Sequence, residues 1–215
     1  MGNRSASAVV GETERVRQIW EKAAPRFDRQ MGFWERVLFS GGREWACSQA
    51  SGDVLEIAVG SGRNFPYYPR DVRLTGIELS PAMLELARSR AAELGLGADL
   101  RLGDAQALEF PDKSFDTVIC TFSLCSIPDD RRAVTEAERV LRPGGRLILL
   151  EHVGSPAFPV RAVQRLLDPL TVRFEGDHLV REPLEHVRAE GLQVEHIERS
   201  KWGIVERLAA RKAAT

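Results

Sequence analysis

A glycine-rich turn is the first feature of the chain with a clear chemical use. The apolar run of residues 54–59 (VLEIAV) is followed directly by Gly60, Ser61 and Gly62. Glycines after a buried strand let the backbone come close to a ligand at the carboxyl end of a sheet. Phe65 stands where the dinucleotide-binding fingerprint has its third glycine, so the full motif is absent. The turn therefore predicts a small-molecule site without naming the ligand.

Two carboxylates follow at the ends of later strand-like runs. Glu78 closes residues 73–78, 18 positions beyond Gly60, where a carboxylate can accept both hydroxyls of a ribose. Asp104 follows residues 99–102 and can accept from an exocyclic amine such as that of adenine. Taken singly, Glu78 is also explained as a surface carboxylate and Asp104 as an Asx turn. Their order and spacing after the glycine turn favour a nucleoside-containing ligand.

A histidine stands at the end of a further apolar run. His152 follows residues 146–151, and an imidazole at a strand end can act as a general base near neutral pH. A hydrogen-bonded structural histidine is an equally good interpretation. His178 and Arg181 fit either one wall of an acceptor pocket or a solvated polar turn, and the sequence favours the turn.

The elements that position these residues alternate between strands and helices. Strands are predicted at 54–59, 73–78, 99–102, 115–122 and 146–151, with helices at 80–94 and 129–141. This alternation predicts a mainly parallel sheet with helices on both faces. Residues 159–190 are expected to be helical, and residues 193–199 and 204–210 to form a final hairpin. The predicted fold class is α/β, with a seven-stranded, mostly parallel sheet that ends in an antiparallel hairpin.

Residues 9–52 carry apolar side chains at helical spacing before the first strand. Six of the 15 aromatic residues lie in this segment: Trp20, Phe27, Phe33, Trp34, Phe39 and Trp45. Helices packed on the edge of the domain and a lid over a small-molecule site explain this density equally well.

Composition excludes several classes of protein. The chain has 215 residues and a net charge of −1, which argues against a broad nucleic-acid surface. Its three cysteines form no CxxC pair, so no disulfide framework and no metal site is expected. No apolar run is long enough to span a bilayer, and the default expectation is a cytoplasmic protein. Four of its 30 basic residues are Lys, and this excess of Arg suggests a bacterial source.

Four segments together resemble class I S-adenosylmethionine (SAM)-dependent methyltransferases. They are VLEIAVGSGRN at 54–64, LTGIELSPAML at 74–84, GDAQALEFPDKSFDTVIC at 103–120 and ERVLRPGGRLILLEHV at 138–153. Ala58 departs from the family pattern, which has a glycine there. Trp20, Phe27 and Asp28 resemble a segment of the ubiquinone and menaquinone methyltransferases. Residues 121–128 and 150–153 are closer to thiol methyltransferases and to small bacterial phosphatidylethanolamine N-methyltransferases.

The resemblance implies a Rossmann-like fold and a role for each matching position. Residues 1–52 would form a helical lid or extension and residues 53–215 the SAM-binding domain. Glu78 would hold the ribose hydroxyls, Leu79 and Met83 would lie beside the adenine, and Asp104 and Ala105 would meet its amine. The methionine part would contact Glu56, Ala58, Val59, Gly60, Ser61, Gly62, Asn64, Thr121 and Phe122. Trp20 and Phe27 would cover the cofactor.

The expected function is SAM-dependent methyl transfer to a small-molecule acceptor through oxygen, nitrogen, sulfur or carbon, with S-adenosylhomocysteine as product. The alternative is a phospholipid N-methyltransferase at a membrane surface, with residues 12–40 lying on the bilayer. A nicotinamide-dependent oxidoreductase and a non-catalytic SAM-binding protein are less favoured. His152 is the expected general base for a hydroxyl or thiol acceptor, with an apparent pKa in the ordinary histidine range. The oligomeric state stays open.

Overall fold

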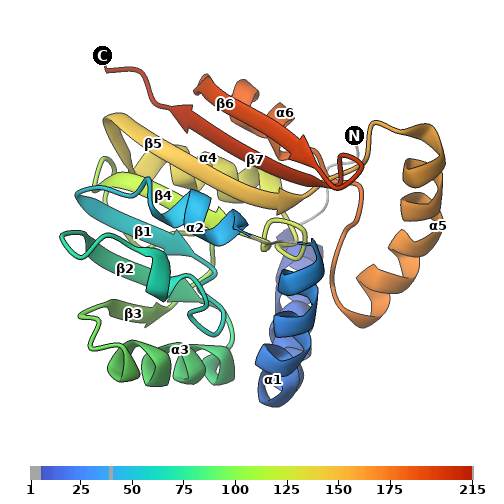
Figure 1. Cartoon of the computed structure of the whole chain (residues 1–215), viewed down its shortest axis with the longest axis horizontal. Coiled ribbons are helices and arrows are strands. Elements are labelled where there is room, and N and C mark those ends of the chain that lie inside the picture. Colours follow the sequence, from blue (N-terminus) through green and yellow to red (C-terminus); the bar gives the residue numbers. More distant parts are fainter. Residues whose placement is uncertain (1–5, 39–40, 215) are drawn as a thin grey trace.

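The computed structural model describes residues 6–38 and 41–214, without the side chains of residues 6–8 and 33–38 (Figure 1). Phe39 and the side chains of Phe33 and Trp34 therefore lie outside the described part. Seven strands form one sheet in the order β3-β2-β1-β4-β5-β7-β6. Their bounds are β1 Asp53–Ile57, β2 Arg73–Glu78, β3 Asp99–Leu102, β4 Phe115–Thr121, β5 Leu141–His152, β6 Gln193–Ser200 and β7 Val205–Arg211.

The pairing of the strands confirms the predicted sheet. The pairs β1–β2, β1–β4, β2–β3 and β4–β5 are parallel. The pairs β5–β7 and β6–β7 are antiparallel, as the predicted terminal hairpin requires. The chain order reverses between β1 and β4, and ligands of open α/β sheets bind at the carboxyl ends of the strands beside such a reversal.

Helices cover both faces of the sheet. The short helix α2 (Gly42–Cys47) and α3 (Pro81–Glu93) bury one face, together with the 3-10 turn η1 (Phe65–Tyr67). The other face packs against α4 (Asp130–Val140) and α6 (Pro183–Ala189). As Figure 1 shows, α5 (Phe158–Phe174) stands away from the sheet. Within the described residues, no helix is both long and apolar enough to cross a membrane.

Side-chain caps account for the predicted starts of the helices at 80–94 and 129–141. Ser80 caps α3 by accepting from the backbone N–H of Met83, and Pro81 is its first residue. Asp129 caps α4 in the same way through the N–H of Arg132.

One predicted boundary was wrong. Strand β5 begins at Leu141, before the predicted start at residue 146, because Phe115 pairs with Leu141 and Thr117 with Arg146, so four residues bulge between the two pairs. The segment before β1, expected to be helical, contains α1 (Ala6–Leu38), which continues through Pro25, and α2.

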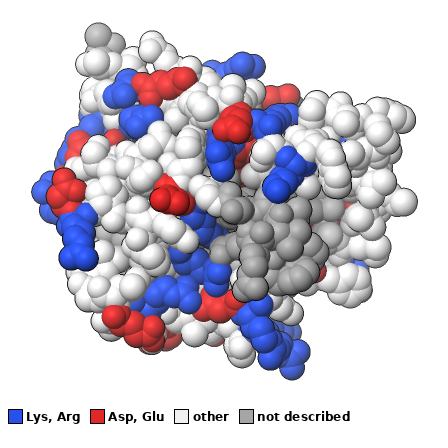
Figure 2. All heavy atoms as spheres, in the orientation of Figure 1, with Lys and Arg blue, Asp and Glu red and all other residues white. Residues whose placement is uncertain are grey.

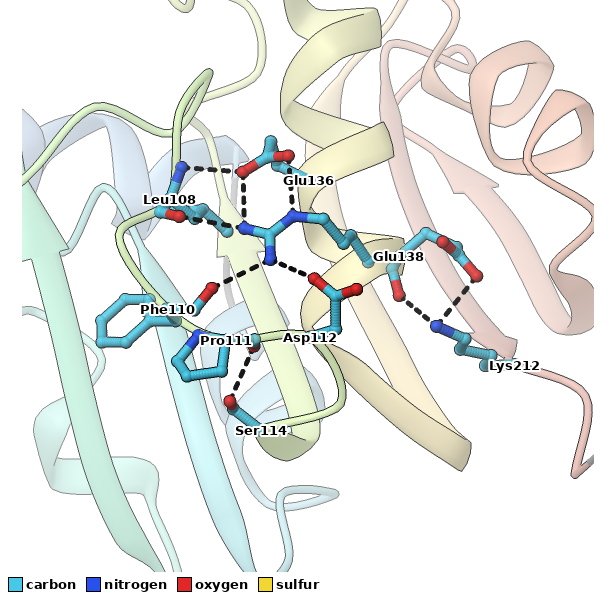
Figure 3. Close-up of polar contacts among 9 residues, drawn as sticks. Leu108, Phe110, Pro111, Asp112, Ser114, Glu136, Glu138 and Lys212 are labelled. Atoms are coloured by element: carbon cyan, nitrogen blue, oxygen red, sulfur yellow. Dashed lines mark hydrogen bonds and ion pairs between the residues drawn. The ribbon is translucent and has the colours of Figure 1, made fainter.

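The loop between β3 and β4 is fixed by one guanidinium group (Figure 3). Arg139 of α4 donates to the carbonyl oxygens of Leu108 and Phe110, each at 2.9 Å, and to Asp112 at 2.7 Å. Glu136 holds the same guanidinium at 2.8 and 2.9 Å and also accepts from the N–H of Leu108. Asp104 belongs to the same loop, so α4 helps to fix the position of this candidate site residue.

Helix α1 is attached to the loops that follow three neighbouring strands. Gln106, after β3, donates to the Thr13 hydroxyl at 3.0 Å. Ser80, after β2, donates to Glu21 at 2.7 Å. Ser61, after β1, donates to Asp28 at 2.6 Å, and Arg90 of α3 pairs with the same carboxylate at 2.5 Å. The three α1 residues are spaced by seven or eight positions, about two helical turns, so they lie on one face of the helix.

The charge on Asp28 strengthens this attachment. Burial raises its pKa, but the hydrogen bond from Ser61 and the charge of Arg90 outweigh that effect, so the net pKa is lowered. A carboxylate with a lowered pKa stabilises the folded state above its ordinary pKa, and the contribution is lost as the pH falls through the folded value. The attachment of α1 is therefore expected to be intact at neutral pH and to weaken in acid.

Asp28→Asn should loosen α1 without unfolding the sheet, since it removes the charge that pairs with Arg90. The carboxylate is partly exposed, so the loss should be about 0.5–1 kcal/mol, or roughly two- to fivefold faster local opening. Hydrogen exchange of residues 20–30 measures this directly. Glu14→Gln is the matched control, because Glu14 bonds only within α1, to Arg17 and Gln18, among the contacts described. Equal exchange in the two variants would contradict the role of Asp28.

Candidate functional site

A cavity of about 980 Å³, part of it open to solvent, lies at the reversal point of the sheet. Its floor is made by the loops that follow β1 to β5, and its roof by Val16, Trp20, Phe27 and Met31 of α1. The rings of Trp20 and Phe27 meet edge to face at 5.7 Å. Both aromatic residues predicted to cover a ligand line this cavity, which lies where open α/β sheets bind small molecules.

The loop after β1 is shaped by residues in the left-handed region. Ala58, Gly60 and Gly62 have φ values of 54°, 57° and 76°. An L residue in this region costs about 1–2 kcal/mol, so Ala58 bears a strain that the family glycine would not. A Cβ at Gly62 would lie 2.4 Å from the Phe65 ring, so packing as well as conformation requires a glycine there.

Not every predicted residue of this loop faces the cavity. Ala58, Val59, Gly60 and Ser61 line it, whereas Glu56, Gly62 and Asn64 lie behind its wall. The Asn64 amide donates to Glu56 at 2.8 Å and to the Thr121 hydroxyl at 3.0 Å. Tyr68 donates to the second oxygen of Glu56 at 2.8 Å. Burial raises the pKa of Glu56 to about 7 against these hydrogen bonds. Glu56 therefore holds the loop in place from within the core.

The β2 and β3 side of the cavity carries the groups that suit a nucleoside. The buried carboxylate of Glu78 accepts from the N–H of Gly60 and of Ser80, each at 2.9 Å. Burial raises its pKa and these backbone donors oppose the rise. Each oxygen keeps a second lone pair for a ligand hydroxyl. Further along the wall lie the predicted residues Leu79, Met83, Asp104 and Ala105.

Gln106 is a wall residue that sequence analysis missed. Its side chain donates to both oxygens of Asp104, at 2.9 and 3.1 Å, and its amide oxygen accepts from the N–H of Asp129 at 3.0 Å. With its bond to Thr13, it connects Asp104 to α1 and α4. An uncharged amide in an irregular loop carries no sequence signal for such a role.

The opposite side of the cavity, beyond β4 and β5, combines a cation with aromatic rings. Arg43 of α2 donates to Asn64 and to the Thr121 hydroxyl, both at 2.8 Å, and lies 5.3 Å from the Phe122 ring centroid. Phe122 has a φ of 52°, a second strained residue at a strand end. Arg43, Thr121 and Phe122 all line the cavity. Sequence analysis missed Arg43 because α2 is short and precedes the first motif.

His152 lies on the same wall, with its ring 5.0 Å from that of Phe122. Burial, followed by the charge of Arg43, lowers the pKa of His152 to about 4. The imidazole is therefore neutral at physiological pH, and its pKa is well below the ordinary range expected from the sequence.

Asp177 is the second residue on this side that sequence analysis missed. It lines the cavity beside Ser126, and the Cys125 thiol donates to its Oδ1 at 3.7 Å. Burial, and then the charge of Glu175, raise the pKa of Asp177 to about 7. The neighbouring motif residues do not line the cavity. Arg181 turns inward to the carbonyl oxygens of Leu124, Ile127 and Pro128, so this segment is not the solvated turn that the sequence favoured.

Sequence comparisons agree with this geometry. The family model described as "Methyltransferase domain" matches residues 55–149. A human (Homo sapiens) thiol S-methyltransferase, TMT1A, is 32% identical over 188 residues, covering 83% of this chain and 77% of that protein. A phosphatidylethanolamine N-methyltransferase of Cereibacter sphaeroides is 40% identical over 127 residues, covering 58% of this chain. The chain spans 61% of the length of that protein. A demethylmenaquinone methyltransferase of Deinococcus radiodurans is 36% identical, and 59% of its length is spanned.

Solved structures share the fold. A SAM-dependent methyltransferase of Thermotoga maritima, described as a possible histamine N-methyltransferase, superposes with a TM-score of 0.67 at 24% identity, over 91% of this chain and 99% of its own. The [4+2]-cyclase SpnF superposes equally well, at 0.67 and 22% identity, over 80% of this chain and 79% of its own. The fold alone therefore does not select the reaction. Taken with the family match and the human relative, the carboxylates and glycine loop at the reversal point identify this chain as a member of the SAM-dependent methyltransferase family.

Proposed function

We propose that this methyltransferase acts on a small acceptor whose reactive atom is a thiol sulfur or an amine nitrogen, and that Asp177 takes the acceptor's proton. The single observation that carries the proposal is the Asp177 carboxyl group in the cavity wall, held against Cys125 in the segment that follows β4, whereas the nucleoside residues Glu78 and Asp104 follow β2 and β3. If the cofactor occupies the part of the cavity lined by Glu78 and Asp104, the methyl acceptor binds in the part that Asp177 lines. The Asp177 carboxylate is then close enough to take the proton of that substrate.

The cavity fits SAM at each of its chemically distinct parts. Glu78 and Asp104 are acceptors for ribose hydroxyls and for an adenine amine. Ile77, Leu79 and Met83 supply apolar surface for the base. Arg43 is placed to pair with the methionine carboxylate, and the strained loop at Ala58 brings backbone groups to the same end. The Phe122 ring offers a face to a sulfonium cation.

When bound, SAM supplies a methyl group that is already activated by the positive sulfur. The chain then has to position the acceptor in line with that methyl and exclude water. Trp20 and Phe27 in the roof serve the second task. We propose that α1, as part of the extension of residues 1–52, is a lid that opens for exchange of cofactor and product.

The proton that leaves the acceptor must go to a group of matched basicity. Thiols and primary ammonium groups have pKa values of about 8.5 and 10. A carboxylate with a pKa of about 7 accepts from either with a small penalty, whereas an imidazole with a pKa of about 4 is a much weaker acceptor. Asp177 is therefore the better general base, and His152 is proposed to pack and orient the acceptor. The thiol and phospholipid substrates in the relatives' names belong to these two acceptor classes.

Glu78→Ala should weaken the binding of S-adenosylhomocysteine by about 1–3 kcal/mol, because it removes a charged acceptor of hydrogen bonds. Titration calorimetry measures the change. Glu85→Ala is the control, since Glu85 is an exposed residue of α3 that pairs with Arg88. Unchanged affinity in the Glu78 variant would remove this residue from the site.

Asp177→Asn should lower kcat by about 10²–10⁴-fold and leave SAM affinity nearly unchanged, as expected for loss of a general base. The wild-type rate should rise with pH through about 7, because Asp177 must be ionised to accept the proton. This rising limb of the pH–rate profile should disappear in the Asp177→Asn variant. The substrates to test are thiols, amines, phenols and dispersed phospholipids, each assayed for release of S-adenosylhomocysteine.

The control for this prediction lies two residues away. Glu175 is exposed and its charge contributes to the raised pKa of Asp177. Glu175→Gln should therefore keep the limb and move it to lower pH with little loss of maximal rate. A limb near pH 4 that vanishes in His152→Gln would assign the proton to His152 instead. A fully active Asp177→Asn enzyme would end the proposal.

A further inference from the structure

Helix α5 presents its polar side to the protein and its apolar side to solvent. Gln164 donates to the carbonyl oxygens of Val153 and Leu179 at 3.0 and 2.9 Å, and Asp168 accepts from the N–H of Leu179 at 2.6 Å. Arg161 pairs with Glu182 at 2.7 Å. None of the residues of α5 is buried. An amphipathic helix of a globular domain normally packs the other way round.

The exposed side chains form a continuous stripe. Leu166 and Phe174 are 75% and 69% exposed, and Val163, Leu167 and Leu170 are 43–55% exposed. At 3.6 residues per turn these five positions fall within an arc of about 100°. Single exposed apolar residues are ordinary, but a contiguous apolar surface marks an interaction site. In Figure 2 the part of the surface formed by α5 is correspondingly almost free of coloured charges.

Two exposed aromatic side chains lie near the start of the helix. Trp202, in the turn between β6 and β7, is 79% exposed, and Phe158 at the start of α5 is 82% exposed. The hydroxyl of Ser155 donates to the Trp202 carbonyl at 2.6 Å, so the turn lies against the residues that lead into α5. We call this surface the outer patch: Phe158, Val163, Leu166, Leu167, Leu170, Phe174 and Trp202.

Most of the charges around the outer patch are positive. Arg165, Arg173 and Lys201 are exposed. Of the two carboxylates within residues 157–175, Asp168 is turned toward Leu179, and Glu175 is exposed just beyond the end of α5. Apolar and aromatic side chains ringed by Arg and Lys match the boundary of an anionic bilayer. A symmetric pair of copies joined through this patch would bring the same basic residues together, which disfavours a second copy as its occupant.

We propose that the outer patch docks the protein on the surface of an anionic membrane. Sequence analysis placed membrane contact on residues 12–40, whereas among the side chains that the structure describes the large exposed apolar surface lies on α5. The end of α5 is joined to the roof of the cavity, since Arg15 of α1 donates to the Val172 carbonyl at 2.9 Å. Docking would therefore bring α1, the roof of the cavity, close to the lipid surface. The inference does not depend on which acceptor is methylated.

Co-sedimentation of the full chain with vesicles tests the proposal. We expect binding to vesicles of equimolar phosphatidylglycerol and phosphatidylcholine, and weaker binding to phosphatidylcholine alone. The double variant Leu166→Gln/Leu170→Gln should lose at least about tenfold in partitioning, because burial of each leucine is favourable. Arg165→Gln/Arg173→Gln should lose affinity for the anionic vesicles only. The control is Leu94→Gln, which changes a 49% exposed leucine at the end of α3 and should bind like wild type.

Three outcomes would overturn the proposal. They are no binding of the wild type to either vesicle, an equal loss in the Leu94 control, and a wild-type dimer by sedimentation velocity that the double leucine variant abolishes. Thermal unfolding checks that each variant is folded, which is expected because both leucines face solvent. Turnover of a water-soluble acceptor should stay within about twofold in the leucine variant, so docking and methyl transfer can fail independently.

Discussion

The site depends on the amide side chain of Asn64, which joins the two strands between which the sheet reverses. It donates to Glu56 on β1 and to Thr121 on β4, and it accepts from Arg43 of α2. Asn64 does not line the cavity, whereas its partners Thr121 and Arg43 do, so it holds the wall without being part of it. Loss of this amide would leave the buried carboxylate of Glu56 short of a donor, which is costly in a low-dielectric interior. The strained residues Ala58 and Phe122 lie close in sequence to Glu56 and Thr121, the residues that Asn64 joins. A hydrogen-bonded network that fixes the surrounding backbone allows such strain to persist.

Two sides of different chemistry follow from that arrangement. The β2 and β3 side holds carboxylates that receive backbone donors, whereas the β4 and β5 side holds an arginine, aromatic rings and two groups with shifted pKa values. Burial acts on those two groups in opposite directions, raising the pKa of Asp177 to about 7 and lowering that of His152 to about 4. The carboxyl group, not the imidazole, is therefore the one that titrates near neutral pH. Helix α1 is held over the cavity by three polar contacts with the loops after β1, β2 and β3, and Arg15 connects it to the Val172 carbonyl of α5.

Most of the fold could be predicted from the sequence, because each element carries a local signal. Buried strands gave apolar runs, Ser80 and Asp129 gave helix caps, and Glu78 and Asp104 marked strand ends by their spacing. The residues that sequence analysis missed act through contacts with residues that are far away in the sequence. Arg43 reaches residues 21 and 78 positions away, and Asp177 meets Cys125 across 52 positions. The reversed orientation of α5 was equally hidden, because periodicity shows that a helix has two faces but not which face meets the protein.

We infer that cofactor and methyl acceptor meet between Glu78 and Asp177. A crystal structure of the chain with S-adenosylhomocysteine would show whether they do. We expect the ribose hydroxyls within hydrogen-bonding distance of the Glu78 carboxylate, the adenine amine at Asp104, and the thioether sulfur facing the side of the cavity that holds Asp177 and His152. A nucleoside bound elsewhere, or a sulfur separated from Asp177 by the protein wall, would contradict the account.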